Sequence, residues 1–314
     1  MPKYRNHLPQ LDGGTFLTDG GLETTLIFHD KLDLPYFAAF HLMKDRDGLQ
    51  ALRRYYATYA SIASTNRVGF VLESPTWRAN PDWGEKLGYS KAALAEVNRV
   101  AVALMRELRD EQETRHSPMV ISGCVGPRGD GYDPGQLMSE NEAEAYHGEQ
   151  ISYFRDSDAD LVTALTITNI PEAIGIVRAA RNLGMPVVIS FTLETDGRLP
   201  TGQGLQEAIE IVDSSTGHAT AYYMINCVHP THFRGVVTKS EWVKRLRGLR
   251  ANASRLSHAE LNEAPVLDEG NPPELGVQYA DLLRQHSHIN VLGGCCGTDH
   301  RHIEEIARCC KADA

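Results

Sequence analysis

Eight short apolar runs, each followed by a longer segment, constrain the fold of this 314-residue chain most strongly. The runs are rich in Val, Ile, Leu, Phe and Thr, and most end in Gly, Asn, Asp or Ser, as buried parallel strands do. We therefore predict strands over residues 15–19, 68–73, 119–123, 161–166, 187–192, 221–226, 248–253 and 289–293.

The segments between these runs carry apolar residues at helical spacing. Residues 49–65, for example, place Leu52, Tyr56, Tyr59 and Ala63 on one face of a helix. Further helices are expected over residues 90–111, 140–157, 171–183, 204–214, 273–286 and 299–311.

This alternation predicts an α/β fold, a single (β/α)8 TIM-type barrel that takes up residues 1–314 as one domain. A doubly wound sheet is the alternative, but it usually has fewer strands and often a G-x-G-x-x-G turn, whose spacing residues 19–21 lack. Active sites of such barrels lie at the C-terminal ends of the strands. The long acidic segment 254–272 is a candidate to cover that end.

The net charge of -10 argues against non-specific nucleic-acid binding, which needs Lys and Arg to neutralise phosphates. No run of 18 or more apolar residues occurs, so we expect no membrane span. The first 14 residues lack the apolar stretch of a signal peptide. We therefore expect a cytoplasmic protein with small-molecule partners, and a homo-oligomer is compatible with the sequence.

The six cysteines lack the spacing of a disulfide framework, so we expect reduced thiols. Cys227 follows the sixth predicted strand, and Cys295 and Cys296 follow the eighth. In a barrel one strand separates these two, so the three thiols are expected to face each other on one rim. The glycines that flank the Cys295–Cys296 pair allow backbone angles that turn both thiols toward one point.

Three thiolates around a zinc ion leave one tetrahedral position open, which is typical of a catalytic site. A substrate thiol in that position loses its proton and becomes a nucleophile for an alkyl group. Spacing alone leaves alternatives open, because buried structural cysteines are common and a vicinal pair can be a redox dithiol. Cys124, Cys309 and Cys310 are assigned to packing. His229 and His232, just after the first of the three cysteines, are assigned to a capping or solvated role.

The sequence resembles the homocysteine S-methyltransferase family over nearly its whole length. The matching segments are residues 18–21 (TDGG), 126–127 (GP), 225–227 (INC), 293–298 (GGCCGT) and 302–303 (HI). The resemblance implies a (β/α)8 barrel in which Cys227, Cys295 and Cys296 bind Zn²⁺ and the sulfur of homocysteine takes the open position.

The implied reaction is a zinc-dependent methyl transfer (EC 2.1.1 class) from a small onium donor to homocysteine, giving methionine. Family donors are S-methylmethionine, S-adenosylmethionine, betaine or, in larger proteins, methylfolate through cobalamin, and a 314-residue barrel is not expected to hold folate or cobalamin modules. The alternatives are the same transfer to another thiol, or a zinc or thiol-redox protein without transferase activity.

For the substrate, the resemblance implies that Asp19, with the amides of Gly20 and Gly21, holds an amino-acid head group. Further candidates for substrate contact close the other strands, namely Glu73, Thr76, Trp77 and Asn226. A donor cation calls for aromatic faces or carboxylates, which Trp77 and Trp83 beside Glu73 and Asp82 could supply, although barrel packing is the alternative for Trp83.

The chain departs from the family where the amino group of homocysteine is expected. The family usually has Glu-Thr at the end of strand four, and here Leu165 and Thr166 stand there. An ammonium without a carboxylate in a partly desolvated pocket would lose on the order of a few kcal/mol. Either Glu23, Glu73 or Glu194 substitutes, or the acceptor is a thiol without an amino group.

Overall fold

The apolar runs form strands because their side chains are buried on both faces of one closed sheet. The structure is a computed structural model that describes residues 1–264 and 266–310, and its eight parallel strands close into a barrel in the order β1 to β8. The strands are β1 Phe16–Leu17, β2 Gly69–Glu73, β3 Met119–Val125, β4 Leu161–Ile167, β5 Val187–Thr192, β6 Tyr222–Asn226, β7 Leu246–Ala251 and β8 Val291–Gly294. The predicted (β/α)8 barrel is confirmed, and each predicted strand overlaps an observed one.

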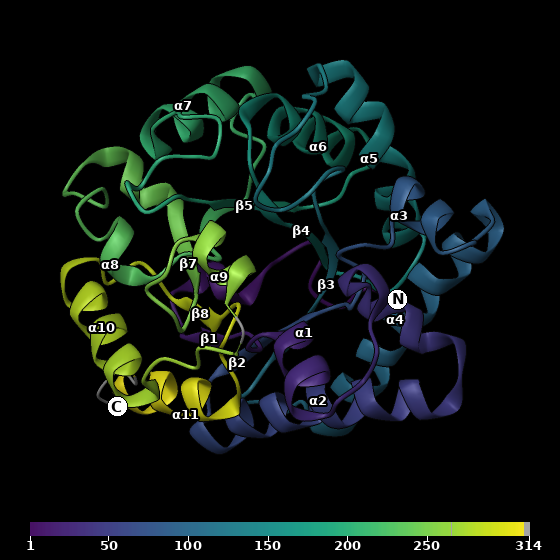
Figure 1. Cartoon of the computed structure of the whole chain (residues 1–314), viewed down its shortest axis with the longest axis horizontal. Helices are drawn as coiled ribbons and strands as arrows, with labels where there is room; N and C mark the ends of the chain where they lie inside the picture. The colour runs from purple at the N-terminus through teal and green to yellow at the C-terminus, as the bar shows by residue number, and fades with distance from the viewer. Residues whose placement is uncertain (265, 311–314) are drawn as a thin grey trace.

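Helices surround the strands in a ring (Figure 1). They are α1 Leu22–Thr24, α2 Arg46–Asn66, α3 Pro81–Lys86, α4 Lys91–Gln112, α5 Glu140–Arg155, α6 Ile170–Asn182, α7 Leu205–Thr216, α8 Pro230–Phe233, α9 His258–Glu263, α10 Pro272–Gln285 and α11 His300–Cys309. Local sequence sets their starts: the Ser90 side chain accepts a hydrogen bond from the Ala93 amide at the start of α4. The predicted helix over 299–311 matches α11, and residue 311 lies outside the described residues.

Two connections differ from the regular alternation of strand and long helix. Between β6 and β7 the chain forms the four-residue α8 and a 3-10 helix over Glu241–Arg245. After β7 the cover segment, residues 254–272, carries the short α9, which lies across the strand ends in the middle of Figure 1. The acidic segment therefore covers the C-terminal end of the barrel, as expected.

The barrel interior changes character along its axis. Its lower part is filled by an apolar cluster that takes inward-facing residues from most strands, including Phe16, Val71 and Leu161. Nearer the C-terminal end the strands present polar groups, as in the 2.8 Å contact between the hydroxyls of Ser122 and Thr163. A polar layer at this end is where a barrel enzyme binds its substrate.

A larger apolar layer packs the outer faces of the strands against the helices. Within the described part of the chain, none of the helices is both long and apolar enough to cross a membrane.

Candidate metal centre

The three predicted cysteines meet at the C-terminal ends of β6 and β8. The Sγ atoms of Cys227, Cys295 and Cys296 all lie within 4.8 Å of one another. The Sγ atoms of Cys227 and Cys296 are 4.0 Å apart. Cys227 is buried and the other two are half-buried, so the cluster is reachable from one side.

Cys227 and Cys295 form a disulfide in the structure, with their Cα atoms 5.3 Å apart. This differs from the expectation of reduced thiols. The physical reason is that β7 anchors both cysteine segments and brings these two sulfurs together. Cys124 and Cys310 are buried and Cys309 is half-buried on α11, in keeping with the packing role assigned to them.

Backbone hydrogen bonds fix the two cysteine segments. The Cys227 amide donates to the Arg250 carbonyl over 3.1 Å, and the Cys295 amide donates to the Ala251 carbonyl over 2.8 Å, so β7 holds both segments in place. Cys227, the first residue after β6, is in the left-handed region with φ 55°, so the extended backbone of the strand ends there.

The glycines beside the cysteine pair act differently from the prediction. Gly297 does take a left-handed angle, with φ 79°. Gly294 does not; it is needed because an added Cβ would lie 2.1 Å from Thr298 Oγ1. Close packing of β8 against this turn, rather than a special backbone angle, explains that glycine.

Asn226 organises the polar groups next to the thiols. Its amide nitrogen donates to Thr166 Oγ1 over 2.8 Å, and its Oδ1 accepts from the Ser190 hydroxyl over 2.6 Å. The same nitrogen lies 3.9 Å from Cys295 Sγ, and Thr166 Oγ1 lies 3.9 Å from Cys227 Sγ. Asn226 was predicted as a substrate contact, and its position next to the cluster is compatible with that prediction.

Tyr132 and His258 complete the surroundings of the thiols, and the sequence did not single out either. The Tyr132 hydroxyl lies 3.0 Å from Cys296 Sγ, and its ring stacks on the imidazole of His258 with centres 4.0 Å apart. His258, on α9, donates from Nε2 to the Cys227 carbonyl over 2.6 Å. Tyr132 lies in the loop after β3 and His258 is the first residue of α9, so only the folded barrel brings them to the cysteines.

Below the cluster lies a buried group of charges. Asp19 pairs with Arg250, with 2.8 Å between Oδ1 and Nη2, and accepts a hydrogen bond from the Tyr55 hydroxyl over 2.9 Å. Burial raises the pKa of Asp19, and burial also raises the pKa of Glu73 to about 7. Arg250 is the cation near both carboxylates.

The predicted head-group residues already have intramolecular partners. Gly21 donates from its amide to the Thr298 carbonyl over 3.0 Å, and the Gly20 carbonyl accepts from Tyr55 and Arg250. Thr76 is fully buried, and its hydroxyl donates to the Cys124 carbonyl over 2.7 Å. The role of Asp19, Gly20, Gly21 and Thr76 toward a substrate stays a prediction.

The two tryptophans proposed to contact a donor cation already lie against cations of the protein. The Arg78 guanidinium lies 4.3 Å from the ring centre of Trp77 and 3.8 Å from that of Trp83. The Lys86 ammonium lies 3.8 Å from the Trp83 ring centre. Both rings therefore already pack against cations of the protein, and contact of Trp77 or Trp83 with a donor stays a prediction.

Leu165 is buried at the end of β4, and its carbonyl accepts a hydrogen bond from Trp77 Nε1 over 3.1 Å. The three alternative carboxylates lie in different surroundings. Glu73 is buried inside the barrel, Glu194 contacts His258 Nδ1 at 3.3 Å, and Glu23 is half-buried on α1.

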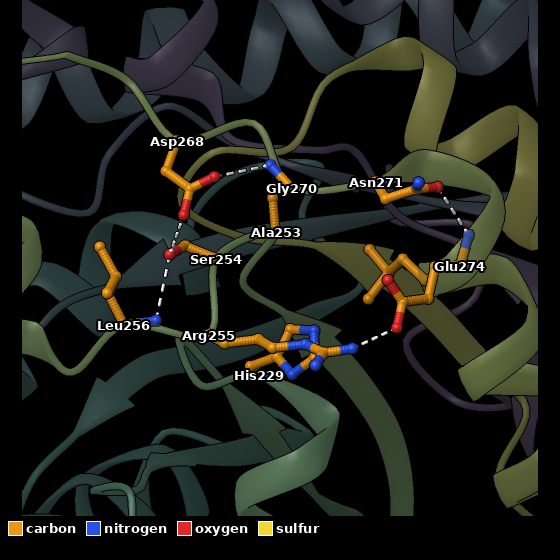
Figure 2. Close-up of a pocket in the computed structure, with 10 residues that line it drawn as sticks. His229, Ala253, Ser254, Arg255, Leu256, Asp268, Gly270, Asn271 and Glu274 are labelled. Atoms are coloured by element: carbon orange, nitrogen blue, oxygen red, sulfur yellow. Dashed lines mark hydrogen bonds and ion pairs between the residues drawn. The ribbon is translucent and has the colours of Figure 1, made fainter.

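A separate cavity of about 250 Å³ lies between the end of β7, the cover segment and α10. Figure 2 shows Arg255 reaching across it to an ion pair with Glu274. His229 lines the cavity, and its Nδ1 accepts from the Thr231 amide, so the capping role predicted for it is confirmed. Among the described residues that line this cavity, none is one of the three cysteines.

A parallel (β/α)8 barrel with clustered thiols at the C-terminal ends of its strands defines a barrel enzyme whose candidate active site is built on cysteine. The family model for homocysteine S-methyltransferase matches residues 16–310. The chain therefore belongs to the homocysteine S-methyltransferase family and is a methyltransferase.

Individual relatives are distant in sequence and similar in fold. Homocysteine S-methyltransferase 1 of Brassica oleracea var. italica is 22% identical over 94% of this chain and 93% of its own length. The crystal structure of the homocysteine methyltransferase MmuM from Escherichia coli in its oxidized form has a TM-score of 0.76 and 17% identity, over 98% of this chain and 99% of that one. Its metallated form has a TM-score of 0.72 and 18% identity, over 96% and 98%.

Proposed function

We propose that this chain is a zinc-dependent S-methyltransferase that moves a methyl group from a small onium donor to homocysteine, giving methionine. The observation that carries the proposal is the cluster of Cys227, Cys295 and Cys296, with all three Sγ atoms within 4.8 Å at the end of the barrel where active sites form. The family match supports the same class of reaction.

The donor set fits zinc. Thiolates are ligands that zinc favours, and three of them leave one tetrahedral position for a substrate. Zinc bound by these residues would lower the pKa of an acceptor thiol and so supply the nucleophile. Because ligands bind as thiolates, the Cys227–Cys295 disulfide has to be reduced before a metal enters.

Neighbouring residues orient the thiols and limit access of water. Asn226 and Thr166 are hydrogen-bonded to each other. Thr166 lies next to the sulfur of Cys227, and Asn226 lies next to the sulfur of Cys295. Tyr132, stacked on His258 of the cover segment, lies over Cys296. A partly closed site strengthens the electrostatic interactions within it and protects a reactive thiolate.

The methyl transfer is a direct displacement at the methyl carbon. The acceptor thiol gives its proton to solvent, and its sulfur forms a bond to the methyl carbon. The bond between that carbon and the positive sulfur or nitrogen of the donor breaks, and the donor leaves as a neutral sulfide or amine. This chemistry favours donors of the S-methylmethionine, S-adenosylmethionine or betaine type. We place the reaction in the cytoplasm, where thiols stay reduced.

The test is a methyl-transfer assay on reduced, zinc-supplemented protein across these donors, with homocysteine and other thiols as acceptors. Methionine formation from homocysteine with at least one onium donor is the expected result. Absence of transfer from all donor and acceptor pairs, together with a reversible Cys227–Cys295 disulfide, would instead identify a thiol-redox protein.

A further inference from the structure

Glu23 is held next to the turn that carries two of the three cysteines. On one side of it, Gly21 donates to the Thr298 carbonyl over 3.0 Å. On the other, Thr24 accepts at Oγ1 from the Gly297 amide over 3.0 Å. These two anchors fix the short α1, so the backbone of Glu23 has little freedom relative to Cys296.

The carboxylate of Glu23 has no partner of its own in the described part of the chain. It accepts no hydrogen bond from another residue and forms no ion pair among residues 1–264 and 266–310, although it is half-buried. Burial raises its pKa to about 7, against the opposing charges of Arg250 and Arg78, neither of which forms an ion pair with it. Its charge acts on both Cys296 and Tyr132, whose sulfur and hydroxyl are 3.0 Å apart. An unpaired, partly desolvated carboxylate is costly unless a cation arrives to pair with it.

The other two candidate carboxylates are less suited to receive a substrate. Glu73 is only 4% exposed inside the barrel, whereas Glu23 is half-buried. Glu194 already contacts the imidazole of His258, with 3.3 Å between its Oε1 and Nδ1. Glu23 alone combines partial exposure, the absence of a described partner and proximity to the thiols.

We propose that Glu23 binds the protonated amino group of the acceptor and thereby selects an amino-acid thiol. The inference rests on the proposed function and identifies the residue that replaces a carboxylate at position 165. Its partner is the acceptor, because Glu23 lies beside the turn of Cys295 and Cys296, where the acceptor sulfur is proposed to bind.

The experiment compares two acceptors, L-homocysteine and 4-mercaptobutanoate, which has the same carbon chain without the amino group. Zinc-loaded wild type, Glu23→Gln and Glu23→Asp are measured for kcat/KM with both acceptors, and for acceptor binding by calorimetry without a donor. The matched control is Asp30→Asn, an exposed carboxylate on the same segment.

For Glu23→Gln we expect kcat/KM and affinity for homocysteine to fall about 10- to 100-fold, as for loss of a charge-assisted hydrogen bond. Values for 4-mercaptobutanoate should change less than about threefold. Glu23→Asp should keep part of the preference, and Asp30→Asn all of it. Retained transfer to 4-mercaptobutanoate shows that the variant is folded.

Equal losses for both acceptors, or no loss for either, would overturn the role of Glu23 while the methyltransferase function stands. A wild-type protein that neither binds nor methylates either thiol would overturn the proposed function, and the role of Glu23 with it. Binding of homocysteine that depends on Glu23, but without transfer from any donor, would support the role of Glu23 and count against the proposed reaction.

Discussion

The hydroxyl of Tyr132 lies 3.0 Å from Cys296 Sγ, while the ring of Tyr132 stacks on His258 of the cover segment. One residue thus links the proposed metal ligand to the segment that covers the barrel. The hydroxyl can donate to the thiolate, and the ring has its own stacking contact with His258.

Replacing Tyr132 with Phe should therefore weaken metal binding without displacing the cover segment. We expect zinc affinity to fall about tenfold or more, because hydrogen bonds to ligand atoms tune a metal site. Competition with a chromogenic chelator measures the affinity. The control is Tyr153→Phe, which removes a hydroxyl bonded to Glu149 on the surface of α5. Unchanged zinc affinity in Tyr132→Phe would show that the hydroxyl does not support the thiolate.

Replacing Arg250 with Met should strongly destabilise the protein. The substitution leaves Asp19 and Glu73 buried without their cation, and loss of one partner of a buried pair costs about 3–5 kcal/mol. Urea unfolding of the reduced protein measures this free energy. The double variant Asp19→Asn/Arg250→Met should regain a large part of the loss. If the double variant is as unstable as the single one, Arg250 acts through packing instead.

The raised pKa of Glu73 should make the stability of the folded protein depend on pH. Its pKa in the folded protein is about 7, above the usual 4.5, so the folded state holds the proton more tightly. The cost of burying Glu73 is thus absent below pH 4.5, grows between pH 4.5 and about 7, and stays constant above that. Glu73→Gln should be stabilised relative to wild type by about 2–3 kcal/mol more at pH 8 than at pH 5.

Unfolding at the two pH values tests this, with Glu85→Gln, an exposed carboxyl on α3, as the control. A difference between wild type and Glu73→Gln that does not change with pH would mean that Glu73 is ionised throughout this range in the folded protein.

Oxidation and metal should exclude each other at the cysteine cluster. After chelation and mild oxidation, we expect Cys227 and Cys295 to be found as one disulfide, with Cys296 open to alkylation. Peptide mapping by mass spectrometry identifies both. In zinc-loaded protein the disulfide should be absent, because zinc takes the same sulfurs as thiolates. A zinc-loaded sample that retains the disulfide would contradict a site of three cysteine ligands.

The strands could be predicted from sequence because both of their faces are apolar, and β5 was predicted to the residue over Val187–Thr192. β7 was placed two residues too late. It begins at Leu246. The two arginines in it break the apolar pattern by which a buried strand is recognised. Arg247 donates to the Gln10 carbonyl, and Arg250 pairs with Asp19, so each guanidinium has a partner far away in sequence.

Part of the site could likewise be predicted from sequence and part could not. The cysteines could be found because each lies just after a predicted strand and within a segment that matches the family. The partners of those thiols could not, since Tyr132 comes from the loop after β3 and His258 from α9, which only the closed barrel brings together. The cation over the tryptophans was missed for a similar reason, because the direction in which Arg78 points depends on the loop geometry.

The most direct test of the account is to measure zinc content and methyl transfer on the same preparation of reduced wild type, Cys296→Ala and the control Cys309→Ala. We predict about one zinc per chain in wild type and in Cys309→Ala, as expected for three ligands and one open position. Cys296→Ala should lose both the metal and methyl transfer to homocysteine. A Cys296→Ala protein that is free of zinc and still transfers methyl groups at the wild-type rate would contradict the central claim.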